Sequence, residues 1–195
     1  MPIMDEQHRA LFFTEARTHR HWLEKPIDDP LLKELYELLR LPPTSANCQP
    51  ARFVFVKSQA AKERLKPALS PGNVEKTMKA PVTVILAYDT EFYFRLTELA
   101  SPQIAENVRN SPPEKRTQMA YQSGTLQGAY LILAARGLGL DCGPLGGFDN
   151  ALVDQEFFPD GKWKSNFLIN LGYGDAAKLH PRQVRLEFEE ACRIE

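Results

Sequence analysis

Val82-Thr-Val-Ile-Leu-Ala-Tyr88 is the longest apolar run in the sequence, and it decides how the chain folds. A run that is nearly all apolar is typical of a β-strand buried on both faces. Shorter β-branched and aromatic runs predict two more strands, at residues 52–57 and 167–173. The run is far shorter than the ~18 residues of a membrane span, so no transmembrane segment is expected.

Apolar residues at helical spacing predict helices around these strands. The best-marked helix begins with Asp29 as N-cap and Pro30 at the first position, and it stops before Pro42. Residues 123–136 are apolar around most of the helix circumference, which predicts a central helix or one at a subunit interface. Because helices and strands mix without strict alternation, the sequence predicts the α+β class. The other predicted helices cover residues 5–17, 58–65 and 149–157.

The composition is that of one ordinary soluble domain. The 195 residues carry 24 Lys and Arg against 25 Asp and Glu, and this net charge of −1 argues against a dedicated nucleic-acid-binding protein. Hydrophobic residues make up 43% and charged residues 25%, so we expect a single domain over residues 1–195. The three cysteines form no CxxC motif and no signal-peptide pattern is present, which favours a reducing, cytoplasmic location.

Residues 89–120 lack a regular hydrophobic period and contain Ser-Pro and Ser-Pro-Pro breaks. A segment this long inside one domain is typical of a functional cover. The aromatic residues 92–94 could pack there on a ring, which makes the segment a candidate substrate cover. The alternative is a helical excursion packed on a partner subunit.

Arg17-Thr-His-Arg20 combines two guanidinium groups with a hydroxyl at the end of a predicted helix. These groups suit a phosphate, although a solvated helix end would also contain them. A metal site is not expected, because His19 and His21 flank Arg20 and the available ligands do not share one helix face.

Pro42-Pro-Thr-Ser-Ala-Asn-Cys-Gln-Pro50 places short donors and acceptors between rigid prolines. Such a loop can bind the edge of a heteroaromatic ring, and the alternative is a capped turn between helix and strand. Cys48 is not expected to be a nucleophile, since no base accompanies it in the sequence.

Five of the eleven glycines lie between Gly137 and Gly147. Their GxGxxxG spacing follows a helix, whereas a dinucleotide fingerprint needs GxGxxG between a strand and a helix. Gly137 and Gly139 are expected to end the helix. Gly143-Pro-Leu-Gly-Gly147 is either a tight turn or a place where the backbone aims N–H groups at a flat ligand.

The sequence contains no GxSxG, HExxH, Walker A or paired-carboxylate signature. No catalytic side chain is therefore assigned. An enzyme without such groups usually takes its chemistry from an organic cofactor.

The sequence resembles the nitroreductase family of FMN flavoproteins in four features that follow one another along the chain. They are the Arg/Thr cluster, the Pro-Thr-Ser-x-Asn-x-Gln-Pro loop, the Gly-Pro-Leu-Gly-Gly stretch and the C-terminal arginine. The resemblance covers nearly the whole chain and looks closest to the malonic semialdehyde reductase branch. The stretches that carry the closer match are 16–19, 41–48, 62–69, 80–83, 129–132, 164–166 and 172–175.

The resemblance implies a mostly antiparallel central sheet flanked by helices, in an intertwined homodimer with FMN at the subunit interface. By position, the FMN phosphate and ribityl chain would be held by Arg17, Thr18 and Arg20, with Arg185 from the C-terminal segment and Arg182 as its competitor. The flavin ring would be approached from the other subunit by Thr44, Ser45 and Asn47. The reactive ring face and N5 would lie near Pro144, Leu145, Gly146 and Gly147.

The chain departs from the family pattern at the first of these groups. Ala16 and Thr18 stand where the family often has the leading Arg and the Ser of Arg-Arg-Ser-x-Arg. One phosphate contact is therefore lost or supplied elsewhere, and His19 is a candidate for it.

The resemblance further implies hydride transfer from NADH or NADPH to flavin N5, and then to a small electrophile in the same pocket. The implied substrate is malonic semialdehyde, reduced to 3-hydroxypropionate, and a cationic side chain would be needed for its carboxylate. Arg95, Arg109 and Arg116 are the candidates in the segment 89–120. The alternatives are a broad nitro- or quinone-reducing flavoenzyme and a flavin-binding protein without turnover.

Overall fold

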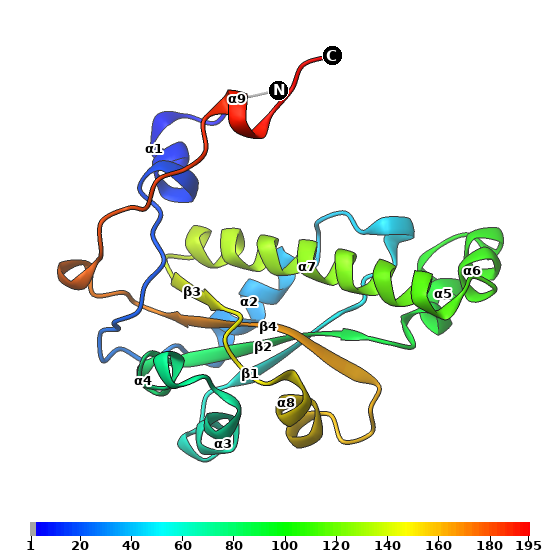
Figure 1. Ribbon diagram of the computed structural model, residues 1–195, viewed down its shortest axis with the longest axis horizontal. Coiled ribbons are helices and arrows are strands. Elements are labelled where there is room, and N and C mark those ends of the chain that lie inside the picture. Colours follow the sequence, from blue (N-terminus) through cyan, green and yellow to red (C-terminus); the bar gives the residue numbers. More distant parts are fainter. Residues whose placement is uncertain (1–2) are drawn as a thin grey trace.

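The central element of the computed structural model, which describes residues 3–195, is a four-stranded antiparallel sheet of order β1-β2-β4-β3 (Figure 1). The strands are β1 (Ala51–Val56), β2 (Val82–Asp89), β3 (Asp141–Leu145) and β4 (Trp163–Gly172). The apolar run at 82–88 forms the buried strand that the sequence predicts, and the α+β class is confirmed.

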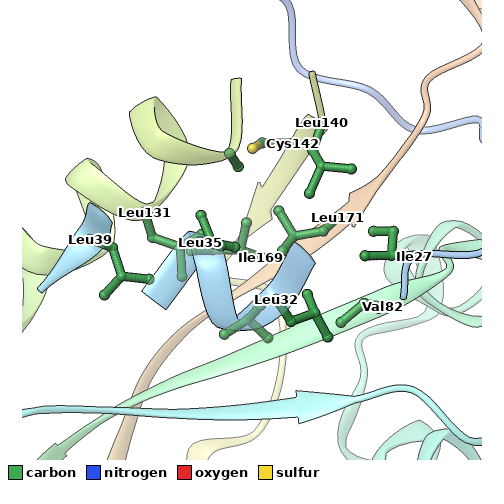
Figure 2. Packing of buried hydrophobic residues seen from close by; sticks show 12 residues of the cluster. Ile27, Leu32, Leu35, Leu39, Val82, Leu131, Leu140, Cys142, Ile169 and Leu171 are labelled. Atoms are coloured by element: carbon green, nitrogen blue, oxygen red, sulfur yellow. The ribbon is translucent and has the colours of Figure 1, made fainter. Parts of the chain in front are cut away.

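Helices cover both faces of this sheet (Figure 1). On one face, α2 (Asp29–Leu39) and the long α7 (Pro113–Gly137) pack on the even-numbered residues Val82 and Val84 of β2 (Figure 2). On the other face, α3 (Gln59–Leu65) and α8 (Asn150–Phe157) pack on Ile85 and Ala87. Side chains alternate across a strand, so a continuous apolar run supplies both cores. The remaining helices are α1 (Glu6–Arg9), α4 (Pro71–Lys79), α5 (Leu96–Leu99), α6 (Pro102–Arg109) and α9 (Phe188–Ala191).

Two predicted helices differ from the structure at one end, the first at its C-terminus and the second at its N-terminus. The predicted helix 5–17 is reduced to α1 and a π-helical turn at Ala10–Thr14, and the chain then runs extended. The N-cap of α2 is Asp28, whose Oδ1 accepts from the N–H of Leu31 at 3.1 Å, so the prediction of Asp29 is wrong by one residue. Both aspartates suit the first turn of a helix, and only the backbone geometry distinguishes them.

The sequence prediction missed α9 in the C-terminal segment and two further elements, α4 and β3. The helix α4 follows Ser70-Pro71, a start signal that the low apolar content of 71–79 obscured. The second is β3, which forms where a turn was expected, because residues 141–145 pair with residues 172–168 of β4. Pro144 is tolerated because β3 lies at the edge of the sheet.

Residues 89–120 form a helical excursion. A 3-10 turn at Phe92–Arg95, α5, α6 and the first turns of α7 enclose a small core, so α7 starts well before the predicted Ser123. Among residues 3–195, no helix has the length and apolar character needed to cross a membrane. The buried residues of this small core are Cys48, Phe92, Leu96, Ala105 and Ala120.

Candidate functional site

A cavity of about 500 Å³ is lined by residues of the N-terminal segment, the C-terminal segment and the C-terminal end of α7. Figure 1 shows the two terminal segments leading away from the sheet side by side. None of the described residues that line the cavity is acidic, and five are arginines. Cationic walls without a carboxylate favour an anionic ligand. The lining residues are Phe12, Phe13, Ala16, Arg17, Thr18, Arg20, Arg136, His180, Pro181, Arg182, Gln183 and Arg185.

The Arg17–Arg20 segment is held against the sheet by backbone pairing with β3. Thr18 forms a parallel bridge with Cys142, and the N–H of His19 donates to the carbonyl of Cys142 at 3.0 Å. The structure therefore brings the predicted phosphate cluster next to the predicted Gly143–Gly147 stretch, which begins one residue after Cys142.

The C-terminal segment is attached to the N-terminal one by arginines. Arg182 Nη2 donates to the carbonyls of Thr14 and Ala16 at 2.7 and 3.0 Å, and Arg17 Nη2 donates to the carbonyl of His180. Arg185 differs, since its Nη1 donates only to carbonyls one and two residues away, at 3.2 and 2.8 Å. Arg182 thus connects the two segments, whereas Arg185 faces the cavity without such a connecting role.

His19 lies outside this cavity. Its side chain is buried, with Nε2 3.3 Å from Asp141 Oδ1. The ring packs so closely on Gly174 that a Cβ there would overlap it, and Nδ1 has no partner among the described residues. The structure therefore directs the His19 ring toward Asp141, and His19 is not among the residues that line the arginine cavity.

Lys76 is a second cation beside Arg20 that the sequence analysis missed. Its pKa is lowered by partial burial and, to a smaller extent, by the positive charge of Arg20. The Trp22 Nε1 donates to the carbonyl of Lys76 at 2.9 Å and fixes α4 to the N-terminal segment.

The Gly143–Gly147 stretch exposes Pro144 and Gly146 to solvent and buries the side chain of Leu145 in the core. Leu145 is buried in the core beneath α3 and α8, so its side chain does not reach the surface. Gly146 is open, because a Cβ there would meet no atom within 4 Å. The carbonyl of Gly147 accepts from Asn73 Nδ2 at 2.6 Å and from the N–H of Ser70 at 3.0 Å, which fixes the end of the stretch.

The predicted ring-binding loop adopts a strained conformation at the other end of α7. Residues Ala46, Asn47 and Gln49 have positive φ values of 52°, 51° and 41°. Such strain is common at functional sites, where the surrounding contacts maintain it. Here Asn47 Nδ2 donates to the carbonyl of Leu99 at 2.9 Å, and Thr44 Oγ1 accepts from the N–H of Gln49 at 3.2 Å.

Within one chain, the loop and the arginine cavity are far apart. Ser45 lines a separate cavity of about 340 Å³ together with Gln118 of α7, whereas Arg136 of α7 lines the arginine cavity. Eighteen residues of α-helix between these two positions span roughly 27 Å. The structure therefore brings two of the three predicted groups together and leaves the third at the opposite end of α7.

The model of the nitroreductase family matches residues 14–173, most of the chain. The chain belongs to the nitroreductase family. A relative from Ralstonia nicotianae, named for a proposed NADH dehydrogenase/NAD(P)H nitroreductase activity, is 54% identical over 100% of both chains. A similarly named relative from Rhodopseudomonas palustris is 52% identical over 98% of this chain and 97% of its own.

Solved structures confirm the nitroreductase fold. A proposed nitroreductase from Exiguobacterium sibiricum, whose crystal structure is a complex with FMN, superposes with a TM-score of 0.85 at 20% identity over 100% of this chain and 99% of its own. A nitroreductase family protein from Streptococcus pneumoniae superposes with a TM-score of 0.82 at 22% identity, over 93% of this chain and 96% of its own.

Cys48 and Cys142, the two buried cysteines, are poor nucleophiles. Burial raises the pKa of the Cys142 thiol to about 12 and also raises that of Cys48. Both thiols are therefore protonated near neutral pH. Among residues 3–195, no group of three or more His, Cys, Asp or Glu side chains is placed to hold a metal ion.

The cationic side chains of the excursion have different partners. Arg95 pairs with Glu98 at 2.9 Å on the surface. Arg116 donates to the carbonyls of Arg109 and Ser111 and lies over the Tyr93 ring, 4.6 Å from its centroid, so its role is to hold the excursion together. Arg109, exposed in the last turn of α6, forms no ion pair with a described residue.

Proposed function

We propose that the protein is an FMN-dependent NAD(P)H oxidoreductase. The observation that carries this proposal is the five-arginine cavity in a nitroreductase fold, which has no acidic lining residue among those described. Its Thr18 is paired with Cys142 of β3, the strand that leads to the open backbone of Gly146. Guanidinium groups and a threonine hydroxyl suit the phosphate of FMN, and an exposed glycine backbone suits a flat ring. The relatives named for NAD(P)H nitroreductase activity support the same reading.

In this proposal, the phosphate and ribityl chain are bound by Arg17, Thr18, Arg20 and Arg185. Arg185 is preferred to Arg182 because the Arg182 guanidinium joins the C-terminal segment to the carbonyls of Thr14 and Ala16, whereas Arg185 contacts only carbonyls of its own segment among the described residues. The His19 ring is left out, since it is buried beside Asp141.

The ring lies against residues 144–147 in this proposal. FMN, when bound, supplies hydride acceptance and donation at N5. The chain orients the reactants: Asn73 and Ser70 fix the carbonyl of Gly147, so the neighbouring N–H groups keep one direction. Pro144 and Gly146 are exposed on this side, whereas Leu145 contributes its backbone alone.

The site is complete only across an intertwined homodimer. Thr44, Ser45 and Asn47 cannot reach the arginine cavity of their own chain, because the length of α7 separates the two. The C-terminal residues 184–188 also alternate apolar and charged side chains, as a half-buried strand does. In the single chain these apolar side chains are exposed, and β1 pairs only with β2 among the described residues. A second copy would cover both features.

The proposed substrate is malonic semialdehyde, reduced to 3-hydroxypropionate with NADH or NADPH and a proton. The sequence resemblance to the malonic semialdehyde reductase branch supports it, and Arg109 is the cation of the excursion best placed to meet a carboxylate. The excursion would then be the substrate cover. The second candidate function, broad nitro- or quinone-reduction, is favoured by the names of the relatives.

Flavin content and anaerobic reduction test the proposal. We expect the purified protein to be yellow, to contain FMN, and to be bleached by NADH or NADPH without oxygen. A protein that stays colourless and gains no flavin from added FMN would contradict it, and a yellow protein that NAD(P)H does not bleach would be a flavin-binding protein without turnover.

Steady-state rates with malonic semialdehyde, a quinone and a nitroarene then separate the candidate substrates. A negligible rate with the aldehyde beside a fast rate with the quinone would exclude the aldehyde as the substrate.

A further inference from the structure

Arg136 lines the arginine cavity although it comes from neither of the two segments that the sequence assigns to the phosphate. It lies in the last turn of α7, and its Nη1 donates to the carbonyl of Phe12 at 3.0 Å. The Phe12 ring packs on Gly137, so the N-terminal π-helical turn sits directly on the end of α7. These two contacts fix the position of the guanidinium at the cavity wall.

The guanidinium of Arg136 retains most of its hydrogen-bonding capacity. An arginine has five N–H donors, and one backbone carbonyl is the acceptor found for Arg136 among the described residues. No carboxylate of residues 3–195 lies within 4.0 Å of it. Asp141, whose charge together with that of Arg136 affects the Cys142 thiol, is already bound by His19 and by the N–H of Gly174.

Ala16 lines the same cavity and offers no side-chain donor. This is the position where the Arg-Arg-Ser-x-Arg pattern has its leading arginine. His19, the nearest alternative along the chain, is turned to Asp141. The other four arginines that line the cavity come from the N-terminal cluster and the C-terminal segment. Arg136 comes instead from α7.

We propose that Arg136 binds the terminal phosphate of FMN and replaces the guanidinium that is missing at position 16. This inference rests on the proposed function and adds a residue to its cofactor site. The predicted ligand group is a phosphate monoester, because a guanidinium fork matches two of its oxygens.

Binding of FMN and riboflavin to the flavin-stripped protein tests the proposal. Riboflavin lacks the phosphate, so Arg136→Met should weaken FMN binding by about tenfold to a hundredfold and leave riboflavin binding unchanged. Quenching of flavin fluorescence gives both dissociation constants. Arg64→Met, which removes the same charge from the last turn of α3 on the other face of the sheet, is the matched control and should change neither.

A double variant, Ala16→Arg with Arg136→Met, tests whether Arg136 replaces the arginine that is missing at position 16. We expect the double variant to regain most of the FMN affinity, since the new guanidinium projects into the same cavity. If Arg136→Met does not fold, Arg136→Lys decides, because it keeps the charge and loses the fork; FMN binding should then fall severalfold and riboflavin binding should not change.

Three results would overturn the inference: unchanged FMN affinity in the Arg136 variants, equal losses for FMN and riboflavin, and no recovery with Ala16→Arg. Equal losses would show that Arg136 only secures the N-terminal turn on α7. The proposed function fails separately, if the unaltered protein binds neither flavin.

Discussion

Lys62 of α3 is buried beneath the C-terminal end of α4, where its Nζ donates to the carbonyl of Thr77 at 2.8 Å and to that of Ala80. These are carbonyls that the end of a helix leaves without partners. The contact fixes α4, which carries Lys76 and Asn73, and burial lowers the pKa of the Lys62 ammonium from 10.5 to about 8.

This lowered pKa predicts a pH dependence of stability. The pKa is lower in the folded protein than in the unfolded chain, so the contribution of Lys62 to stability is complete above about pH 10.5 and is lost as pH falls through about 8. Relative to Lys62→Met, the unfolding free energy of the unaltered protein should therefore rise by about 2 kcal/mol between about pH 7.5 and pH 10. Urea unfolding at both pH values measures the difference, and parallel pH curves for the two proteins would contradict the prediction.

Asn170 in the core strand β4 is, like Lys62, a buried polar residue whose side chain is hydrogen-bonded. Asn170 is buried, and its Oδ1 accepts from Thr83 Oγ1 at 2.7 Å while its Nδ2 donates to Thr77 Oγ1 at 3.1 Å. The amide thus links β4, β2 and α4, and its polar atoms are satisfied. The sequence alone shows only an asparagine within an apolar run.

At the scale of elements, the excursion of residues 89–112 depends on one arginine of α7. Arg116 Nη1 donates to the carbonyl of Arg109 at 2.8 Å, where α6 ends, and to that of Ser111, while its guanidinium covers the Tyr93 ring. Apart from the small core around Phe92, these contacts are what attach α6 to α7.

We expect Arg116→Met to loosen the excursion without unfolding the domain. Amide hydrogen exchange should become at least about tenfold faster in residues 92–111, because loss of a charged hydrogen-bond donor costs about 1.5–3 kcal/mol. Exchange in β2 and β4 should not change. Arg95→Met is the control, since the Arg95–Glu98 pair is exposed and contributes little. Equal exchange in the two variants would refute the role assigned to Arg116.

The elements differ in how much of them the sequence could predict. β2, α2 and α8 follow from local signals: an apolar run, a Pro at the first turn, and Asp149 as an N-cap that accepts from two N–H groups. β3 has no such signal, because its Gly and Pro residues oppose strand formation and only the ladder with β4 selects the extended form. The N-terminal helix is interrupted because the chain pairs with β3 from Thr18 onward.

At the scale of the whole molecule, the C-terminal segment has an apolar side that the single chain does not cover. The exposed fractions of Val184, Leu186 and Phe188 are 93%, 70% and 55%, and Figure 1 shows this segment extending away from the sheet beside α1. Such contiguous apolar exposure is typical of an interface with another chain.

The proposed homodimer predicts that Leu186→Asp shifts the protein toward monomer. A buried carboxylate at the interface would be strongly unfavourable, and sedimentation velocity at micromolar concentration should show the shift. FMN occupancy should fall with it, because in the proposed dimer the Thr44–Asn47 loop of the site belongs to the second copy. Leu152→Asp on α8, at a side chain 44% exposed, is the control and should leave the dimer intact. An unaltered protein that is monomeric and retains FMN would rule out the shared site.

The sequence by itself determined the central strands, the main helices and the residue types of the proposed phosphate site, because hydrophobic period, helix caps and donor chemistry are local properties. Only the tertiary structure decided which of these side chains converge. Arg136 lines the same cavity as Arg17 and Arg20 because α7 packs against the N-terminal segment, and the His19 ring is directed toward Asp141. The separation of the Thr44–Asn47 loop from that cavity likewise follows from the length of α7, since contacts between residues distant in the chain depend on how whole elements pack.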